Sequence, residues 1–248
     1  MKQGNLTAAA LKRIAAVVML IDHAAIAFLS PEAGSALLTA GGTLSRTDII
    51  YLVMRLIGRM AFPLYAFFLA EGFMRTRDAK AYLKRLLILA LISEVPFDLL
   101  NTGRPFDLSA QNTVFTLAIS LAAIMFADRM AIRPEDSPSV RSAKTLRMMA
   151  VTAAAGIVSG LLRFDYGLLG PVLPAIFYWF RFDQVSRNVL AAGTMLWGGQ
   201  STGVLSLIPI TFYSGEKGRQ SRYGFYIFYP LHLAVLAAAA FFIKRAGA

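Results

Sequence analysis

The chain has 248 residues, of which 57% are hydrophobic and only 16% are charged, whereas soluble proteins average about 45–50% apolar and about 25% charged residues. This composition predicts an integral membrane protein with no sizeable soluble catalytic domain, because each bilayer-spanning helix needs about 20 apolar residues. The net charge of +11 indicates cytoplasmic loops near anionic lipid rather than nucleic-acid binding, and the absence of cysteine excludes disulfides, thiolate metal sites and a cysteinyl acyl intermediate.

The apolar segments predict an all-α polytopic membrane bundle of about eight or nine transmembrane helices, organised as one domain over residues 1–248. The expected spans, in chain order, are Ala8–Leu29, Asp48–Met74, Lys84–Leu100, Gln111–Ala127, Met148–Leu162, Leu168–Phe180, one or two within Asn188–Tyr213, and Tyr223–Ile243. The hydrophilic stretch Asp128–Leu146 is expected to be a loop, and Arg163–Gly167 the turn of a helical hairpin. The span count depends on whether Asn188–Tyr213 is one span or two short helices broken at Gly198–Ser201.

The distribution of lysine and arginine predicts the orientation, because loops rich in these residues stay cytoplasmic. With either eight or nine spans, most of the basic residues fall on the side of the amino terminus. We therefore expect a cytoplasmic amino terminus. The same rule leaves the direction of the last span open.

Three ionisable side chains from separate spans are expected near the middle of the bilayer. At about 1.5 Å per residue, His23 lies about 15 Å beyond Arg13 and Glu94 about 14 Å beyond Arg85, and His232 is central in the last span. Ionisable groups at this depth are costly unless they are paired or wet. One shared site explains all three, and the alternative is that each is a structural residue in a wet bundle interior.

Asp22 and His23 are adjacent, so on a helix their side chains point about 100° apart and cannot form a direct pair. Arg59 is the expected ion-pair partner of Asp22, with Arg55 on the same face as the alternative. We expect His23 to be a general base, because imidazole accepts a proton near neutral pH. Arg59 would also stabilise a developing oxyanion. A purely structural ion pair is the alternative for Asp22.

Basic residues on the predicted inner side suit the phosphates of an anionic donor. They are Lys12, Arg13, Lys84, Arg85, Lys217 and Arg219. The alternative is that they are ordinary positive-inside residues. No metal site is expected.

Several short sequence strings occur one after another along the chain. They are Leu11–Ala15, Met19–His23, Arg55–Leu64, Glu71–Phe73, Ser93–Asp98, Gln111–Leu117, Asp165–Gly167 and Phe225–His232. As an ordered set from residue 11 to residue 232, they resemble the TraX family. The loop Tyr213–Gly218 departs from the family's usual Tyr-Asn-Gly beginning.

The resemblance implies acetyl-CoA as donor, an intramembrane histidine as catalyst and a bacterial inner membrane location. The family is named for a protein that N-acetylates pilin, and it is similar to a wider group of transmembrane acyltransferases. We therefore expect an acyltransferase that moves an acetyl group from cytoplasmic acetyl-CoA to an amine or hydroxyl, such as a pilin amino terminus or a glycan. The acceptor, the acyl chain length and the oligomeric state stay open.

Two other classes of function compete with this expectation. In a proton-coupled transporter or lipid carrier, His23, Glu94 and His232 would form a proton relay. In a non-catalytic assembly subunit, the basic loops would dock partners. Membrane lipids are expected partners in each case, and nucleic acid is not.

Overall fold

A computed structural model describes residues 4–29, 45–221 and 223–246. The described residues fold into helices and turns, and their only β-type pairings are the isolated bridges Leu6–Tyr213 and Gln111–Phe164, so the all-α prediction is confirmed. The chain divides into two compact units, the first within Met1–Tyr65, Ile92–Asp107 and Gly199–Ala248 and the second within Ala66–Leu91 and Leu108–Gly198. The assignment of residues 1–248 to one domain stays a prediction.

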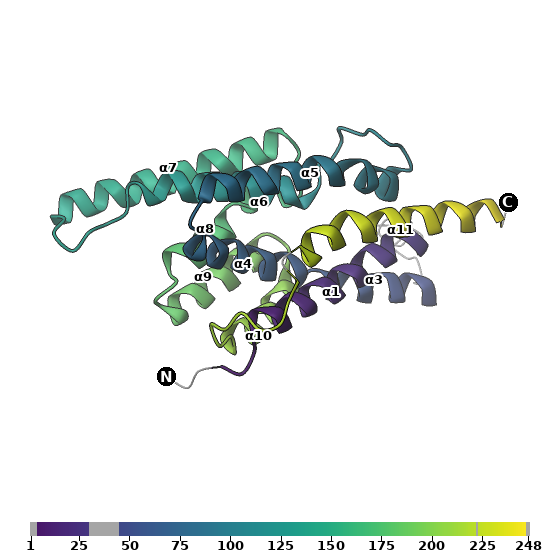
Figure 1. Cartoon of the computed structure of the whole chain (residues 1–248), viewed down its shortest axis with the longest axis horizontal. Coiled ribbons are helices and arrows are strands. Elements are labelled where there is room, and N and C mark those ends of the chain that lie inside the picture. The colour runs from purple at the N-terminus through teal and green to yellow at the C-terminus, as the bar shows by residue number, and fades with distance from the viewer. Residues whose placement is uncertain (1–3, 30–44, 222, 247–248) are drawn as a thin grey trace. The chain divides into compact units, whose positions relative to one another are not determined.

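The first unit is built around three helices that lie side by side (Figure 1): α1 (Ala8–Phe28), α3 (Arg46–Gly58) and α11 (Gly224–Ala246). It also holds η2 (Ser201–Ser206), α10 (Leu207–Thr211), the first residues of α4 (Ala61–Arg75) and the second half of α5 (Ala79–Thr102). Helices α1 and α11 run parallel, since their amino-terminal turns line one pocket and their carboxyl-terminal turns line another. Helix α3 runs antiparallel to α1.

The amino-terminal end of α1 is fixed by the chain that precedes α11. The backbone N–H of Ala8 donates to the carbonyl of Glu216 over 2.8 Å, and that of Ala9 donates to the carbonyl of Lys217 over 3.1 Å. Thr7 caps the helix as well, accepting from the N–H of Ala10. The first N–H groups of a helix have no partner within it, so these bonds hold the 214–217 loop against the start of α1.

The second unit contains α6 (Thr113–Asp128), α7 (Pro138–Leu161), η1 (Gly167–Leu169), α8 (Val172–Trp179) and α9 (Gln184–Trp197), with the remainder of α4 (Ala61–Arg75) and α5 (Ala79–Thr102). Its predicted hairpin is present: α7 turns back through Arg163–Gly167 into η1 and α8. The carboxylate of Asp165 accepts from the Thr113 hydroxyl, and its carbonyl accepts from Thr116. These bonds tie the hairpin turn to the first turn of α6.

The structure interrupts one predicted helix and decides an alternative that the sequence left open. The expected single span Asp48–Met74 is two helices interrupted at Arg59–Met60. Pro63 explains this, because its ring has no N–H and clashes with the carbonyl four residues earlier. The open alternative for Asn188–Tyr213 resolves as short helices, with the break at Gly198–Gln200.

The hydrophilic loop after α6 is shorter than the predicted Asp128–Leu146. Helix α7 already begins at Pro138, because Ser137 caps it by accepting from the N–H of Val140 and proline is favoured in a first turn. In the loop itself, the backbone N–H of Arg133 and the ammonium of Lys144 hold the pKa of the Asp136 carboxyl below its usual range. The polar residues of this stretch thus form a helix end as well as a loop.

Within the part of the chain that the structure describes, two helical segments are long and apolar enough to cross a membrane, Arg46–Arg75 and Gly224–Ala246. Three more are apolar but shorter, Thr113–Asp128, Gly167–Trp179 and Ser201–Thr211. Helix α1 is long enough but carries Lys12, Arg13 and Asp22. The total of eight or nine spans stays a prediction.

Gly58 sets the close approach of α3 to α1, and its replacement tests that packing. A Cβ at this position would lie 2.1 Å from Oδ1 of Asp22. We expect Gly58→Ala to lower the free energy of unfolding by about 1–3 kcal/mol, the usual cost of overpacking, measured as thermal unfolding in detergent. Gly193→Ala is the control, because a Cβ there meets no atom within 4 Å. Equal stability of the two variants would contradict this packing.

Candidate active site

The two histidines of the chain meet in the first unit. Nδ1 of His23 on α1 lies 2.7 Å from Nε2 of His232 on α11, and the two rings are stacked with their centroids 4.9 Å apart. His232 is buried, with 6% of its surface exposed. The two histidines are therefore in direct contact, whereas the level that they were expected to share with Glu94 in the bilayer stays a prediction.

The backbone of α11 decides which nitrogen of each histidine carries the hydrogen. Nδ1 of His232 lies 2.8 Å from the carbonyl oxygen of Phe228, which can only accept, so this nitrogen is the donor. Neutral His232 then has its lone pair on Nε2, and Nδ1–H of His23 must donate to it. The lone pair of His23 therefore sits on Nε2, where it can take a further proton.

Aromatic rings hold His232 in this orientation. The ring of Phe228 stacks on it, with 4.7 Å between the ring centroids and 7° between the ring planes. The ring of Tyr229 meets it edge-on, with the centroids 5.7 Å apart. Sequence reasoning did not assign these two residues. The spacing of Phe228, four residues before His232 in the same helix, is a signal that would have identified it.

Asp22 pairs with Arg55 and not with Arg59, which corrects the preferred sequence prediction. Nη1 of Arg55 lies 2.6 Å from Oδ2 of Asp22, with 22% and 17% of the two side chains exposed. Arg59 follows the last turn of α3, where it is the C-cap residue. Because that helix ends at Gly58, Arg55 is the arginine that faces Asp22, and Arg59 has no ion pair among the described residues.

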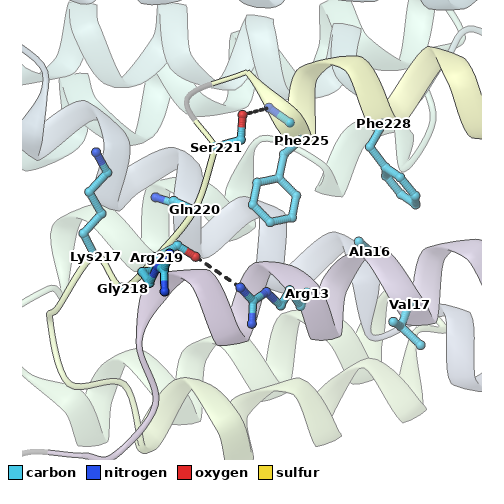
Figure 2. Close-up of a pocket in the computed structure, with 11 residues that line it drawn as sticks. Arg13, Ala16, Val17, Lys217, Gly218, Arg219, Gln220, Ser221, Phe225 and Phe228 are labelled. Atoms are coloured by element: carbon cyan, nitrogen blue, oxygen red, sulfur yellow. Dashed lines mark hydrogen bonds between the residues drawn. The ribbon is translucent and has the colours of Figure 1, made fainter.

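A pocket of about 730 Å³ opens at the amino-terminal ends of α1 and α11 (Figure 2). Arg13, Lys217 and Arg219 line it, and the guanidinium of Arg13 donates to the carbonyl of Arg219 over 3.1 Å. Phe225 and Phe228 line it from α11. The pocket thus joins a basic surface to the aromatic ring that stacks on His232.

The other predicted residues are distributed as follows. Lys12 does not line the pocket, and its ammonium lies 5.7 Å from the centre of the Phe225 ring. Glu94 lies on α5 in the first unit, directly before Val95. Lys84 and Arg85 are exposed on the part of α5 that belongs to the second unit. The roles of these four residues stay predictions.

Comparison with known proteins gives one family and one named relative. The family model described as TraX protein matches residues 7–239. The chain is also similar to the "Probable fimbrial assembly protein FimC, serogroup H1" of Dichelobacter nodosus, at 29% identity over 94% of this chain and 96% of that protein. No solved structure matches the chain.

The Asp22–Arg55 ion pair is tested by a double-mutant cycle. We expect Asp22→Asn and Arg55→Gln each to lower the free energy of unfolding by about 1–3 kcal/mol, because each leaves a half-buried partner unsatisfied. The double variant should be no less stable than either single variant. Arg59→Gln is the matched control and should change stability little. Additive losses for Asp22 and Arg55, or coupling of Asp22 to Arg59, would contradict the pair, as measured by thermal unfolding.

Proposed function

The chain belongs to the TraX family, and from this and the site we propose that it is an integral-membrane acetyltransferase. It takes an acetyl group from cytoplasmic acetyl-CoA and transfers it to an amine or hydroxyl acceptor, such as a pilin amino terminus or a glycan. The observation that carries the proposal is the hydrogen-bonded pair of His23 and His232 beside a basic pocket. The relative named for fimbrial assembly supports an acceptor at the cell surface.

In this proposal His23 is the base and His232 is the residue that positions it. The acceptor loses its proton to Nε2 of His23 while its oxygen or nitrogen attacks the thioester carbonyl. Nδ1–H of the resulting imidazolium stays bonded to Nε2 of His232, and this bond strengthens when the donor is charged. The C–S bond then breaks, and the proton passes from His23 to the departing thiolate of coenzyme A.

The donor pocket supports entry of acetyl-CoA from the side of the amino terminus. The phosphates would lie among Arg13, Lys217 and Arg219, and the pantetheine arm would extend along α1 past Val17. Ten residues separate Arg13 from His23, a rise of about 15 Å. The reach of the arm, roughly 15–20 Å in extended form by bond lengths of the usual size, matches this depth.

The parallel course of α1 and α11 supports a membrane topology with an odd number of spans. Helices that run parallel across a bilayer begin on the same side of it. We therefore favour nine spans over eight, in the bacterial inner membrane, with the amino terminus in the cytoplasm and the carboxyl terminus outside. The basic residues Lys217 and Arg219 then lie on the cytoplasmic side, as the positive-inside rule favours.

Replacement of each histidine separates the base from the residue that positions it. We expect His23→Gln to lower the transfer rate by about 10²–10⁴, the usual value of a general base. His232→Gln should retain more activity than His232→Leu, because an amide oxygen still accepts from Nδ1–H of His23. Initial rates with radiolabelled acetyl-CoA measure both effects. Full activity in His23→Gln would overturn the assignment of the base.

Charge reversal in the donor pocket tests where coenzyme A binds. We expect Lys217→Glu and Arg219→Glu to raise the apparent KM for acetyl-CoA at least about tenfold, since a hydrogen bond to a charged group contributes about 1.5 kcal/mol or more. The value of kcat should change little, as when binding is lost equally from ground and transition states. Acetylpantetheine, which lacks the phosphates, is the control substrate, and its KM should not change. A parallel rise in that KM would show that the variants distort the pocket.

One measurement separates this proposal from a transporter or an assembly subunit. Purified protein should hydrolyse acetyl-CoA slowly in the absence of an acceptor, because water can replace the acceptor at His23. A proton-coupled carrier or a docking subunit is not expected to break the thioester bond and release coenzyme A. Absence of both hydrolysis and coenzyme A binding would overturn the proposed function.

A further inference from the structure

A second cavity, of about 820 Å³, lies within the first unit on the far side of the histidine pair from the donor pocket. Its lining begins at Ile26 on α1 and Ala234 on α11, three and two residues after the histidines. The donor pocket ends at Val17 and Phe228, six and four residues before them. The histidines therefore stand between two cavities along both helices.

The lining of this second cavity is mostly apolar. Helix α5 contributes Pro96, Leu99 and Leu100, and alanines of α11 contribute much of the opposite wall. A volume of this size lies within the range of roughly 300–1,000 Å³ that is usual for small-ligand pockets. The cavity thus has room for an apolar chain that begins about one helical turn beyond the proposed base.

The charged groups of the lining are all positive. Arg55 and Lys244 line the cavity, and no aspartate or glutamate does so among the described residues. Asp22 neutralises Arg55 from the α1 side over 2.6 Å, while Lys244 has no ion pair among the residues that the structure describes. A cavity with this charge attracts an anion and repels a protonated amine.

We infer that this cavity is the acceptor site and that its substrate is an anionic amphiphile whose acceptor group is a hydroxyl. The inference rests on the proposed function and narrows its acceptor. The hydroxyl oxygen forms a bond to the acetyl carbonyl carbon, the C–S bond breaks, and the hydroxyl proton goes through Nε2 of His23 to the coenzyme A thiolate. The products are an acetyl ester and free coenzyme A.

Three single-chain probes of equal chain length test the charge and the acceptor group. They are lysophosphatidylglycerol, with hydroxyls and one negative charge, monoacylglycerol, with hydroxyls and no charge, and an alkylamine. The protein is held in phosphatidylcholine nanodiscs, whose lipid offers neither a hydroxyl nor an amine, and acetylated product is measured by mass spectrometry. We expect a kcat/KM for lysophosphatidylglycerol about tenfold above that for monoacylglycerol, and the lowest value for the amine. Faster acetylation of the amine would overturn the inference in favour of an amino-terminal acceptor.

Matched pairs of variants test the place of binding. Lys244→Glu should abolish the preference for the anionic probe, while Arg245→Glu, at the neighbouring residue that does not line the cavity, should keep it. Ala237→Trp fills the cavity and should raise the KM for lysophosphatidylglycerol at least tenfold, while Val235→Trp, on the exposed side of α11, should not.

Binding of coenzyme A, followed as a rise in the thermal unfolding temperature, distinguishes a failure of the proposed function from a failure of the acceptor-site assignment. If wild-type protein binds no coenzyme A, the proposed function itself is wrong. If all four variants bind coenzyme A but Ala237→Trp acetylates lysophosphatidylglycerol like wild type, only the assignment of the acceptor cavity is wrong. If Ala237→Trp does not bind coenzyme A, Ala234→Leu gives the same test with a smaller change in volume.

Discussion

The hydrogen bond from His232 to the carbonyl of Phe228 determines the chemistry that the first unit can perform. It places the hydrogen of His232 on Nδ1, which leaves Nε2 to accept from His23 and leaves the lone pair of His23 on its other nitrogen. Without that bond, either histidine could take either role. A main-chain group of one helix thus selects which histidine of the pair can accept a further proton.

Other contacts within the first unit fix the position of α1, the helix that carries His23. The carbonyls of the 214–217 loop hold the start of α1, and the Asp22–Arg55 ion pair holds its middle against α3. Gly58 permits the short distance that the ion pair needs. Because His23 is adjacent to Asp22, the same contacts that neutralise the carboxylate also set the position of the imidazole.

The sequence was sufficient for the helical class, for most helix positions and for bringing His23 and His232 together, since these follow from apolar segments and the rise per residue. It was insufficient to choose between Arg55 and Arg59. That choice depends on where α3 ends, which Pro63 determines through its clash with the carbonyl of Arg59, four residues earlier. The polar start of α7 could not be predicted, because a hydrophilic helix lacks the apolar periodicity by which a helix is identified in a sequence. The two cavities depend on packing between distant segments, which no local pattern encodes.

The separation of the two histidines along the chain has a consequence for biosynthesis. His23 and His232 are 209 residues apart, while Asp22 and Arg55 are only 33 apart. At a ribosomal rate of about 5–20 residues per second, Arg55 is synthesised a few seconds after Asp22. His232 is synthesised about 10–40 s after His23. The nascent chain can therefore neutralise α1 early and assemble the histidine pair only when translation is nearly complete. An unfinished chain released from the ribosome would hold a neutralised first helix, but its His23 would lack the hydrogen-bond partner that orients it.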